Sequence, residues 1–124
     1  MLIQDQLTEQ FIGAAIEVHR ELGPGLLESA YEECFCHELH LRNFSFRRQV
    51  DLPVAYKDLK LDCGYRLGIV IENLVVVELK SIGAIPPCSS STATHILALE
   101  REEVGLLINF NVAVLKNGIV RRVL

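Results

Sequence analysis

The N-terminal part of the chain places apolar residues three to four positions apart, a spacing typical of amphipathic helices. The first such stripe begins at Leu7, with Thr8 as the expected N-cap, and ends at Leu22. The Gly-Pro-Gly sequence at 23–25 stops that helix. A second stripe predicts a helix over residues 27–42. We therefore expect two helices joined by a tight turn.

After this helical region the apolar residues form short runs between turn residues, a pattern typical of strands. The runs predict strands at residues 46–56, 59–72 and 74–81, connected by turns at 57–58 and at Asn73. Proline in the first strand indicates an edge or a bulge, and glycine in the second indicates a bend. The three strands are expected to form a meander.

The last part of the chain predicts one helix and further strands. Residues 89–101 predict a third helix, and residues 104–111 predict another buried strand. A helix between two strands of one sheet predicts a parallel, right-handed crossover from strand 74–81 to strand 104–111. An Asn-Gly pair at 117–118 is a hairpin signal, which would join a strand at 113–116 to the last strand of the chain.

Length and the order of elements together predict the fold class. A chain of 124 residues fits one domain, which we place at residues 1–124. The elements predict an α/β fold with flanking helices and a central mixed sheet, which contains the three-strand meander.

The formal net charge of −4 conceals a strong asymmetry. Residues 1–38 hold eight acids and one base, a net charge of −7, whereas residues 39–124 hold eight acids and eleven bases, a net charge of +3. The whole is not the electrostatic footprint of a strong duplex binder. A basic strip in the second part is an open alternative to a solvated sheet face, and its candidates are Arg42, Arg47, Arg48, Lys57, Lys60 and Arg66.

The hydropathy and the cysteines of the chain predict its cellular compartment. The chain has no 18-residue apolar run and no basic segment followed by a long apolar block, so we expect no membrane contact and no signal peptide. The four cysteines form no Cys-x-x-Cys pair, so we expect reduced thiols in a cytoplasmic protein. The spacing of Cys34, Cys36, His37 and His40 is not that of a zinc site.

The most specific chemistry lies in Leu-Val-Val-Val-Glu-Leu-Lys at residues 74–80. Since side chains alternate faces in a strand, Glu78 and Lys80 point the same way, whereas Leu79 points into the other layer. A carboxylate and an ammonium therefore emerge side by side at the end of a buried strand. Such a pair is either a strand-end salt bridge or part of a binding site, because buried charge needs a partner.

Further motifs accompany this pair in a characteristic order. They are Gly-Leu-Leu-Glu-Ser-Ala-Tyr at 25–31, Arg-Gln-Val at 48–50, Gly-Tyr-Arg-Leu at 64–67, Val-Glu-Leu-Lys at 77–80 and Gly-Leu-Leu-Ile-Asn-Phe-Asn at 105–111. This combination closely resembles the GxxExxY family of small proteins, which is assigned to the PD-(D/E)XK nuclease-like superfamily. The resemblance extends over residues 7–123.

The resemblance implies a restriction-endonuclease-like core and a metal-dependent site. In that superfamily a helix glutamate, a strand aspartate and the acidic residue of a Glu-x-Lys motif hold one or two Mg²⁺ ions, and the motif lysine orients or activates water. Carried over by position, Glu28 and Glu78 are the metal ligands, and Lys80 joins them as a catalytic residue. The helix that carries Glu28 is expected to pack against the meander, which brings it towards Glu78.

One departure from the family pattern removes a ligand. The strand aspartate is replaced by Gly68, which has no ligand atom. Asp62 and Glu72 keep the same strand parity, but in a continuous strand they would lie about 20 Å and about 13 Å away. We therefore expect a site with two carboxylates and weak Mg²⁺ binding.

A second departure lies at the start of the third helix. The family usually carries a His-Glu-x-x-Gln-like signature there, and Ser89, Ser90 and Thr92 occupy those positions. Framework positions are kept while two positions linked to the site are altered. The pattern indicates a preserved fold with degraded chemistry.

Two functions are consistent with these residues. The first is a nuclease-like, Mg²⁺-dependent phosphodiester hydrolase whose activity is weakened or lost. The second is a non-catalytic domain that retains the fold and binds a nucleic acid, a protein partner or a second copy of the chain. Tyr31, Tyr65 and Arg66 are candidate substrate contacts, although Tyr31 could equally pack in the core and Arg66 could pair with an acid.

Overall fold

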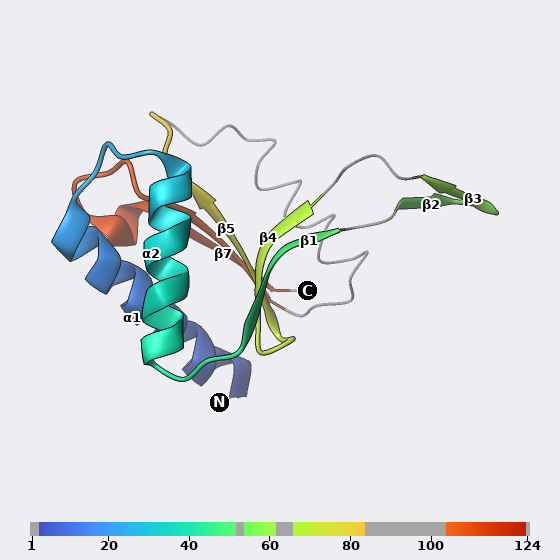
Figure 1. Ribbon diagram of the computed structural model, residues 1–124, viewed down its shortest axis with the longest axis horizontal. Helices are drawn as coiled ribbons and strands as arrows, with labels where there is room; N and C mark the ends of the chain where they lie inside the picture. Colours follow the sequence, from blue (N-terminus) through green and yellow to red (C-terminus); the bar gives the residue numbers. More distant parts are fainter. Residues whose placement is uncertain (1–2, 52–53, 62–65, 84–103, 124) are drawn as a thin grey trace.

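The computed structural model describes residues 3–51, 54–61, 66–83 and 104–123. This part of the chain forms two helices, a five-stranded sheet and a two-stranded hairpin (Figure 1). The helices are α1, Ile3–Leu22, and α2, Glu28–Leu41. The strands are β1, Phe46–Asp51, β2, Val54–Tyr56, β3, Leu59–Leu61, β4, Arg66–Ile71, β5, Val75–Lys80, β6, Val104–Asn109, and β7, Ile119–Val123; a short 3₁₀ helix, η1, Leu115–Gly118, precedes β7.

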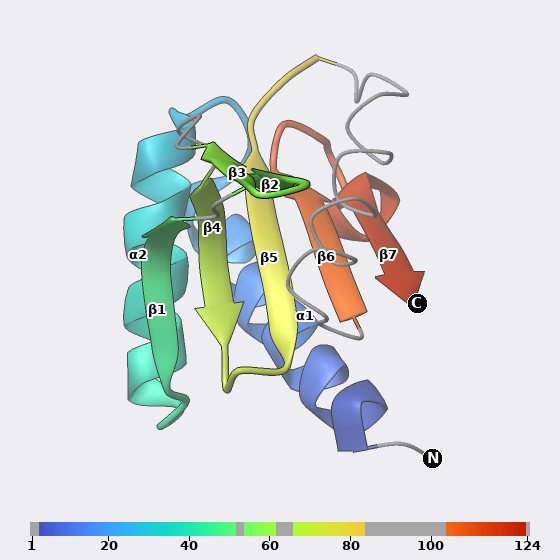
Figure 2. The ribbon, with the colours of Figure 1, turned by 90° about the vertical axis from the view of Figure 1, so that its right-hand side faces the viewer.

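The five-stranded sheet is mixed. Its order is β1-β4-β5-β6-β7, and each neighbouring pair is antiparallel except the parallel pair β5 and β6 (Figure 2). The antiparallel neighbours β1, β4 and β5 confirm the predicted meander. The parallel β5–β6 pair confirms the predicted strand direction, whereas the connection between them, with the predicted third helix, lies outside the described residues.

Both helices cover one face of this sheet, and the hydrophobic core lies between the two layers (Figure 2). The sheet contributes alternate residues, because successive side chains of a strand point to opposite faces. Fully buried residues of this core include Phe11, Tyr31, Phe35 and Leu39 on the helices, and Ile69, Ile71, Val75, Val77 and Ile108 on the strands. The predicted α/β fold class is therefore confirmed.

The first two predicted strands are each divided. The segment 46–56 contains β1 and β2, and the segment 59–72 contains β3 and β4. β2 and β3 pair only with each other among the described strands, around the predicted turn at 57–58, and Figure 1 shows this hairpin projecting away from the main sheet.

Two local predictions are wrong. α1 begins at Ile3, so Thr8 is not an N-cap; it is buried within the helix, where its hydroxyl oxygen has no hydrogen-bond partner in the described structure. Nothing in the first residues stops a helix, since they contain neither glycine nor proline. At the other end, residues 113–116 form no strand, and β7 pairs with β6 instead.

Gly118 explains the second error. A Cβ atom at this position would lie 2.2 Å from the backbone oxygen of Asn109, so only glycine allows the close approach of η1 to the end of β6. Leu115 turns inward and is buried. The Asn-Gly pair therefore reflects a close backbone approach and not a two-residue hairpin turn.

Candidate active site

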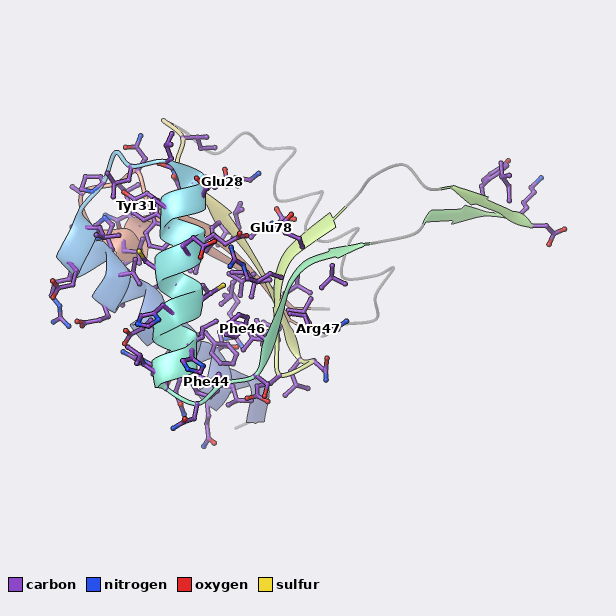
Figure 3. All side chains as sticks on the ribbon, in the orientation of Figure 1. Glu28, Tyr31, Phe44, Phe46, Arg47 and Glu78 are labelled. Atoms are coloured by element: carbon purple, nitrogen blue, oxygen red, sulfur yellow. The ribbon has the colours of Figure 1, made fainter. Side chains whose placement is uncertain are left out.

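The end of β5 and the start of α2 meet at a cleft of about 190 Å³. The three predicted site residues, Glu28, Glu78 and Lys80, line it together with Gly68. Figure 3 shows Glu28 at the first turn of α2 and Glu78 on the neighbouring sheet. The remaining lining residues are Glu32, Gln49 and Leu79.

Glu28 is the first residue of α2, and Tyr31 fixes the turn that precedes it. The Tyr31 hydroxyl donates to the backbone oxygen of Gly23 at 2.5 Å and accepts from the backbone N–H of Leu26 at 3.1 Å. Its buried ring stacks on Phe110, with 4.3 Å between the ring centres. This position favours the interpretation of Tyr31 as a residue that packs in the core over its interpretation as a substrate contact. Its hydroxyl fixes the turn that precedes α2.

The end of β5 is held by the neighbouring strand β6. The backbone N–H of Phe110 donates to the backbone oxygen of Lys80 at 2.9 Å. The side chain of Asn109 accepts from the N–H of Ile82 at 3.1 Å and donates to the Ile82 oxygen at 3.0 Å. Asn109 is buried, so these bonds satisfy its amide and fix the chain directly after Lys80.

One hydrogen bond links the two sides of the cleft. The Ser81 hydroxyl donates to the backbone oxygen of Leu26 at 2.6 Å. Leu26 also binds Tyr31 through its N–H, so the turn before Glu28 is tied both to α2 and to the residue that follows Lys80. Direct hydrogen bonds between the turn before α2 and the end of β5 therefore set the relative position of the two predicted metal ligands.

The electrostatics of Glu78 differ from those of a surface carboxylate. Burial raises the pKa of Glu78; the nearby ammonium of Lys80 opposes this rise, and the charge of Glu28 adds to it. Glu78 and Lys80 are half-buried, and within the described residues neither side chain forms a hydrogen bond or an ion pair. This favours a binding site over the salt-bridge alternative, because desolvated charges without a partner are typical of functional clefts.

Glu78→Gln is expected to raise the melting temperature of the metal-free protein at neutral pH. The pKa of Glu78 is higher in the folded chain than in the unfolded chain, so stability is lost as the pH rises through the folded pKa. The advantage of the variant should therefore shrink in acid and disappear below about pH 4, where the carboxyl is protonated in both states. Thermal unfolding across this pH range measures the difference, with the exposed Glu9→Gln on α1 as the control. A less stable Glu78→Gln at neutral pH would contradict this account.

Gly68 lies beside Glu78 on the adjacent strand. Ile69 pairs with Val77 across the antiparallel β4–β5 ladder, so the preceding residue is next to Glu78 and shares its face. A Cβ atom at Gly68 would lie 3.1 Å from the backbone oxygen of Val77 and 4.0 Å from the Cα atom of Glu78. A carboxylate at this position would therefore enter the cleft next to Glu78.

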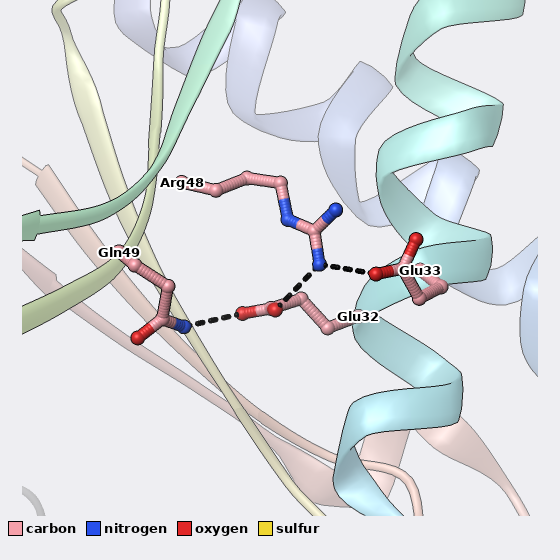
Figure 4. A network of polar contacts seen from close by, with 4 residues as sticks. All are labelled: Glu32, Glu33, Arg48 and Gln49. Carbon is pink, nitrogen blue, oxygen red and sulfur yellow. Dashed lines mark hydrogen bonds and ion pairs between the residues drawn. The ribbon is translucent and has the colours of Figure 1, made fainter.

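A polar network that the sequence did not reveal connects β1 to α2 (Figure 4). Glu32 on α2 accepts from Arg48 at 2.8 Å and from Gln49 at 3.0 Å. Arg48 also donates to Glu33 at 2.7 Å, and this bond lowers the pKa of Glu33 below its ordinary value. The Arg-Gln-Val motif was visible in the sequence, but its spacing gave no indication that both polar side chains reach one helix.

Several other candidates lie elsewhere. Glu72 is in the β4–β5 turn, at the opposite end of β4 from the cleft, where its Oε1 accepts from the backbone N–H of Ser45 at 3.0 Å. Arg66 begins β4, but its side chain lies outside the described part of the chain. The other candidates that lie outside it are Asp62, Tyr65, Ser89, Ser90 and Thr92.

A larger hollow of about 350 Å³ lies between α1 and α2, and it is a weaker candidate for the functional site. Three of its four glutamates are already in ion pairs, so they are not available to a ligand without breaking those bonds. The pairs are Glu17 with Arg20, Glu33 with Arg48 and Glu38 with Arg42. We therefore place the candidate site at the smaller cleft on β5.

The donor atoms of that cleft suit a hard cation, because carboxylate and amide oxygens are the ligands that Mg²⁺ prefers. Among the described residues, no three His, Cys, Asp or Glu side chains are grouped to hold a metal. The cleft thus offers Glu28 and Glu78 as carboxylate ligands, and Glu32 is occupied by Arg48 and Gln49. Neither described helix is long and apolar enough to cross a membrane.

Comparison with known proteins identifies the class. The chain matches the PD-(D/E)XK nuclease superfamily over residues 5–123, and it therefore belongs to that superfamily. The mixed five-stranded sheet with two helices on one face is consistent with the nuclease-like fold. No curated protein and no solved structure matches the chain.

Proposed function

We propose that the chain is a GxxExxY-type member of the superfamily, a single domain whose metal-dependent phosphodiester hydrolysis is weakened or lost. The observation that carries this proposal is the cleft itself. It holds Glu78 and Lys80, half-buried and without hydrogen-bond partners among the described residues, together with Glu28. In this proposal Glu28 and Glu78 hold Mg²⁺, and Lys80 is the third catalytic residue.

Each side chain would have a distinct role in hydrolysis. A bound Mg²⁺ lowers the pKa of its water and offsets phosphate charge. Glu28 and Glu78 provide oxygen ligands from two elements whose spacing is set by the Ser81–Leu26 hydrogen bond. Lys80 points to the same face as Glu78, where its ammonium can orient the attacking water and stabilise the negative charge that develops on the phosphate.

Weakened activity follows from Gly68. The position next to Glu78 carries no oxygen ligand, so the ion would be held by less charge and with looser geometry. Since catalysis depends on holding the reacting groups within a narrow range of geometry, a loose ion lowers the rate as well as the affinity.

A non-catalytic binding domain is the second candidate, and the pairing of the basic side chains favours it. Arg48 binds two glutamates of α2, Arg42 binds Glu38 at 3.0 Å, and Lys57 lies over the Tyr56 ring at 5.4 Å. These cations of the predicted basic strip are thus engaged within the protein. A cytoplasmic protein partner or a second copy of the chain would then replace a nucleic acid as the ligand.

Titration calorimetry with Mn²⁺ tests the metal site. The wild type is expected to bind weakly, with a Kd above about 10 μM (roughly −7 kcal/mol), because the cleft has only two free carboxylates. Glu78→Gln should abolish the binding heat, whereas the exposed Glu9→Gln should leave it unchanged. If the wild type binds no Mn²⁺, or if Glu78→Gln binds as well as the wild type, the hydrolase proposal is wrong and the non-catalytic candidate remains.

Cleavage of labelled DNA in the presence of Mn²⁺ separates binding from chemistry. Lys80→Gln should keep the metal affinity of the wild type and lose any cleavage, because Lys80 acts on the water and the phosphate and does not bind the ion. Metal binding without cleavage in the wild type would mean that the site has lost its chemistry and retained its ligands.

A further inference from the structure

We propose that Gln49 supplies the oxygen ligand that Gly68 lacks, with its side-chain amide oxygen standing in for the absent aspartate carboxylate. This inference rests on the proposed metal site at Glu28 and Glu78. It assigns to β1 a ligand role that the sequence placed on α2, β4 and β5.

The first observation is the position of Gln49 across the sheet. In the β1–β4 ladder Arg48 pairs with Ile69 and Val50 with Leu67, so Gln49 lies opposite Gly68. Gln49, Gly68 and Glu78 therefore form one row across three neighbouring strands. Because Gly68 has no side chain, nothing at the middle of the row separates the long side chain of Gln49 from the cleft, and Gln49 lines it.

The second observation is the backbone of Gln49. Its φ angle is +51°, in the left-handed region that residues other than glycine rarely adopt inside a strand. In a regular strand Arg48 and Gln49 would point to opposite faces, yet both donate to Glu32 (Figure 4). The left-handed backbone thus brings the Gln49 amide to Glu32 of α2, although the register of β1 already places this residue beside Gly68 and the cleft. Unfavourable backbone conformations persist where the surrounding structure holds them in place, and they cluster at functional sites.

The third observation is the orientation of the amide. An ionised carboxylate only accepts hydrogen bonds, so the Gln49 Nε2 atom faces Glu32, at 3.0 Å from its Oε1. Arg48 holds the other carboxylate oxygen of Glu32 at 2.8 Å, which fixes the acceptor in turn. The amide oxygen of Gln49 is consequently directed away from Glu32, and it accepts no hydrogen bond in the described part of the chain.

An amide oxygen suits this place chemically. It is a hard ligand that Mg²⁺ and Mn²⁺ accept, although it contributes no charge. A neutral third ligand completes the oxygen set without placing another negative charge beside Glu28 and Glu78, whose charges already repel. Such a site binds a divalent ion more weakly than one with three carboxylates, and it is more stable when empty.

Calorimetry with Mn²⁺ on two variants tests the assignment. Gln49→Asn keeps an amide and tolerates the left-handed backbone, but it is one methylene shorter, so its Kd should rise about tenfold or more. Gln49→Glu keeps the length and adds a charge, so its Kd should fall about tenfold. Asn73→Gly is the control, since Asn73 also has a positive φ, +55°, but lies in the β4–β5 turn away from the cleft. This control should bind Mn²⁺ like the wild type.

The outcomes separate this inference from the proposed function. If Gln49→Asn and Gln49→Glu bind like the wild type while Glu78→Gln loses binding, the metal site exists and Gln49 is not part of it. If neither the wild type nor any variant binds Mn²⁺, both proposals are overturned. The metal-free melting temperature of each variant, measured in parallel, identifies any variant that fails to fold. Gln49→Gly, which accepts the same backbone conformation, then replaces that variant in the test.

A double-mutant cycle with Gly68→Asp makes the test specific. If the amide oxygen fills the aspartate position, Gln49→Asn should weaken Mn²⁺ binding about tenfold in the wild type and much less in the Gly68→Asp background, where a carboxylate takes over. An equal loss in both backgrounds would show that Gln49 acts elsewhere, for instance by positioning Glu32, and would overturn the assignment.

Discussion

Gly68→Asp is expected to bind Mn²⁺ about 10- to 100-fold more tightly than the wild type, because it adds a charged oxygen ligand next to Glu78. The position is suitable on geometric grounds. Gly68 neighbours Glu78 on the antiparallel β4–β5 pair and already lines the cleft. The new carboxylate would therefore complete a set of three acids with Glu28 and Glu78.

The same substitution should destabilise the metal-free protein by about 1–3 kcal/mol. The new Cβ atom would lie 3.1 Å from the backbone oxygen of Val77, so the strands have to move slightly apart. Three acids would also repel one another in a cleft where the pKa of Glu78 is already raised. Bound metal removes this repulsion, and at 100 times the Kd it restores about 2.7 kcal/mol.

Melting temperatures with and without Mn²⁺ measure both effects. Gly68→Ala is the matched control, because it introduces the same Cβ contact without an oxygen ligand; it should lose stability and gain no affinity for metal. Equal Mn²⁺-induced shifts in the wild type and in Gly68→Asp would show that Gly68 does not mark the vacant ligand position.

Phe110→Ala is expected to lower the free energy of unfolding by about 3–5 kcal/mol, the largest loss of stability among the variants considered. Phe110 is fully buried and stacks on Tyr31, with 10° between the ring planes. Its ring also lies 6.3 Å from the ring of His19, whose Nε2 is 2.8 Å from the backbone oxygen of Val112. Removing the ring leaves a cavity where α1, α2 and the end of β6 meet.

Tyr31→Phe separates the ring from the hydroxyl. This variant keeps the stack on Phe110 but leaves the Gly23 oxygen and the Leu26 N–H without their partner, so it should cost about 1–2 kcal/mol. Urea unfolding measures both variants. A loss below about 1 kcal/mol in Phe110→Ala would contradict the central role of the stack, since it would mean that the surrounding side chains fill the cavity.

Periodicity and turn residues predicted most of the fold. The stripe that ends at the Gly-Pro-Gly sequence predicted the end of α1, and α2 begins and ends within one residue of the predicted helix at 27–42. The meander and the parallel pair of β5 and β6 also followed from the sequence. These features depend on local patterns, and alternation within a strand determined that Glu78 and Lys80 share a face.

The features that the sequence did not reveal depend on contacts between distant residues. Gln49 lies in a run that reads as a regular strand, and nothing in that run indicates its positive φ or its hydrogen bond to Glu32 of α2. Gly118 resembles a hairpin glycine until Asn109 occupies the space next to it. The residues that complete the cleft and the C-terminal turn are thus determined by packing, which periodicity does not record.

All residues assigned to the cleft lie between positions 28 and 80, yet Asn109 of β6 fixes the chain after β5. β4 and β5 pair across a short turn, with Ile71 opposite Val75, whereas each residue of β5 pairs with a residue of β6 that lies 29 positions later in the chain. Pairing over such a distance costs more chain entropy than pairing across a short turn, so it forms later in folding. A nascent chain that ends before β6 would therefore carry every proposed ligand of the site without the strand that fixes the chain after Lys80, and the site would be completed only when β6 has paired with β5.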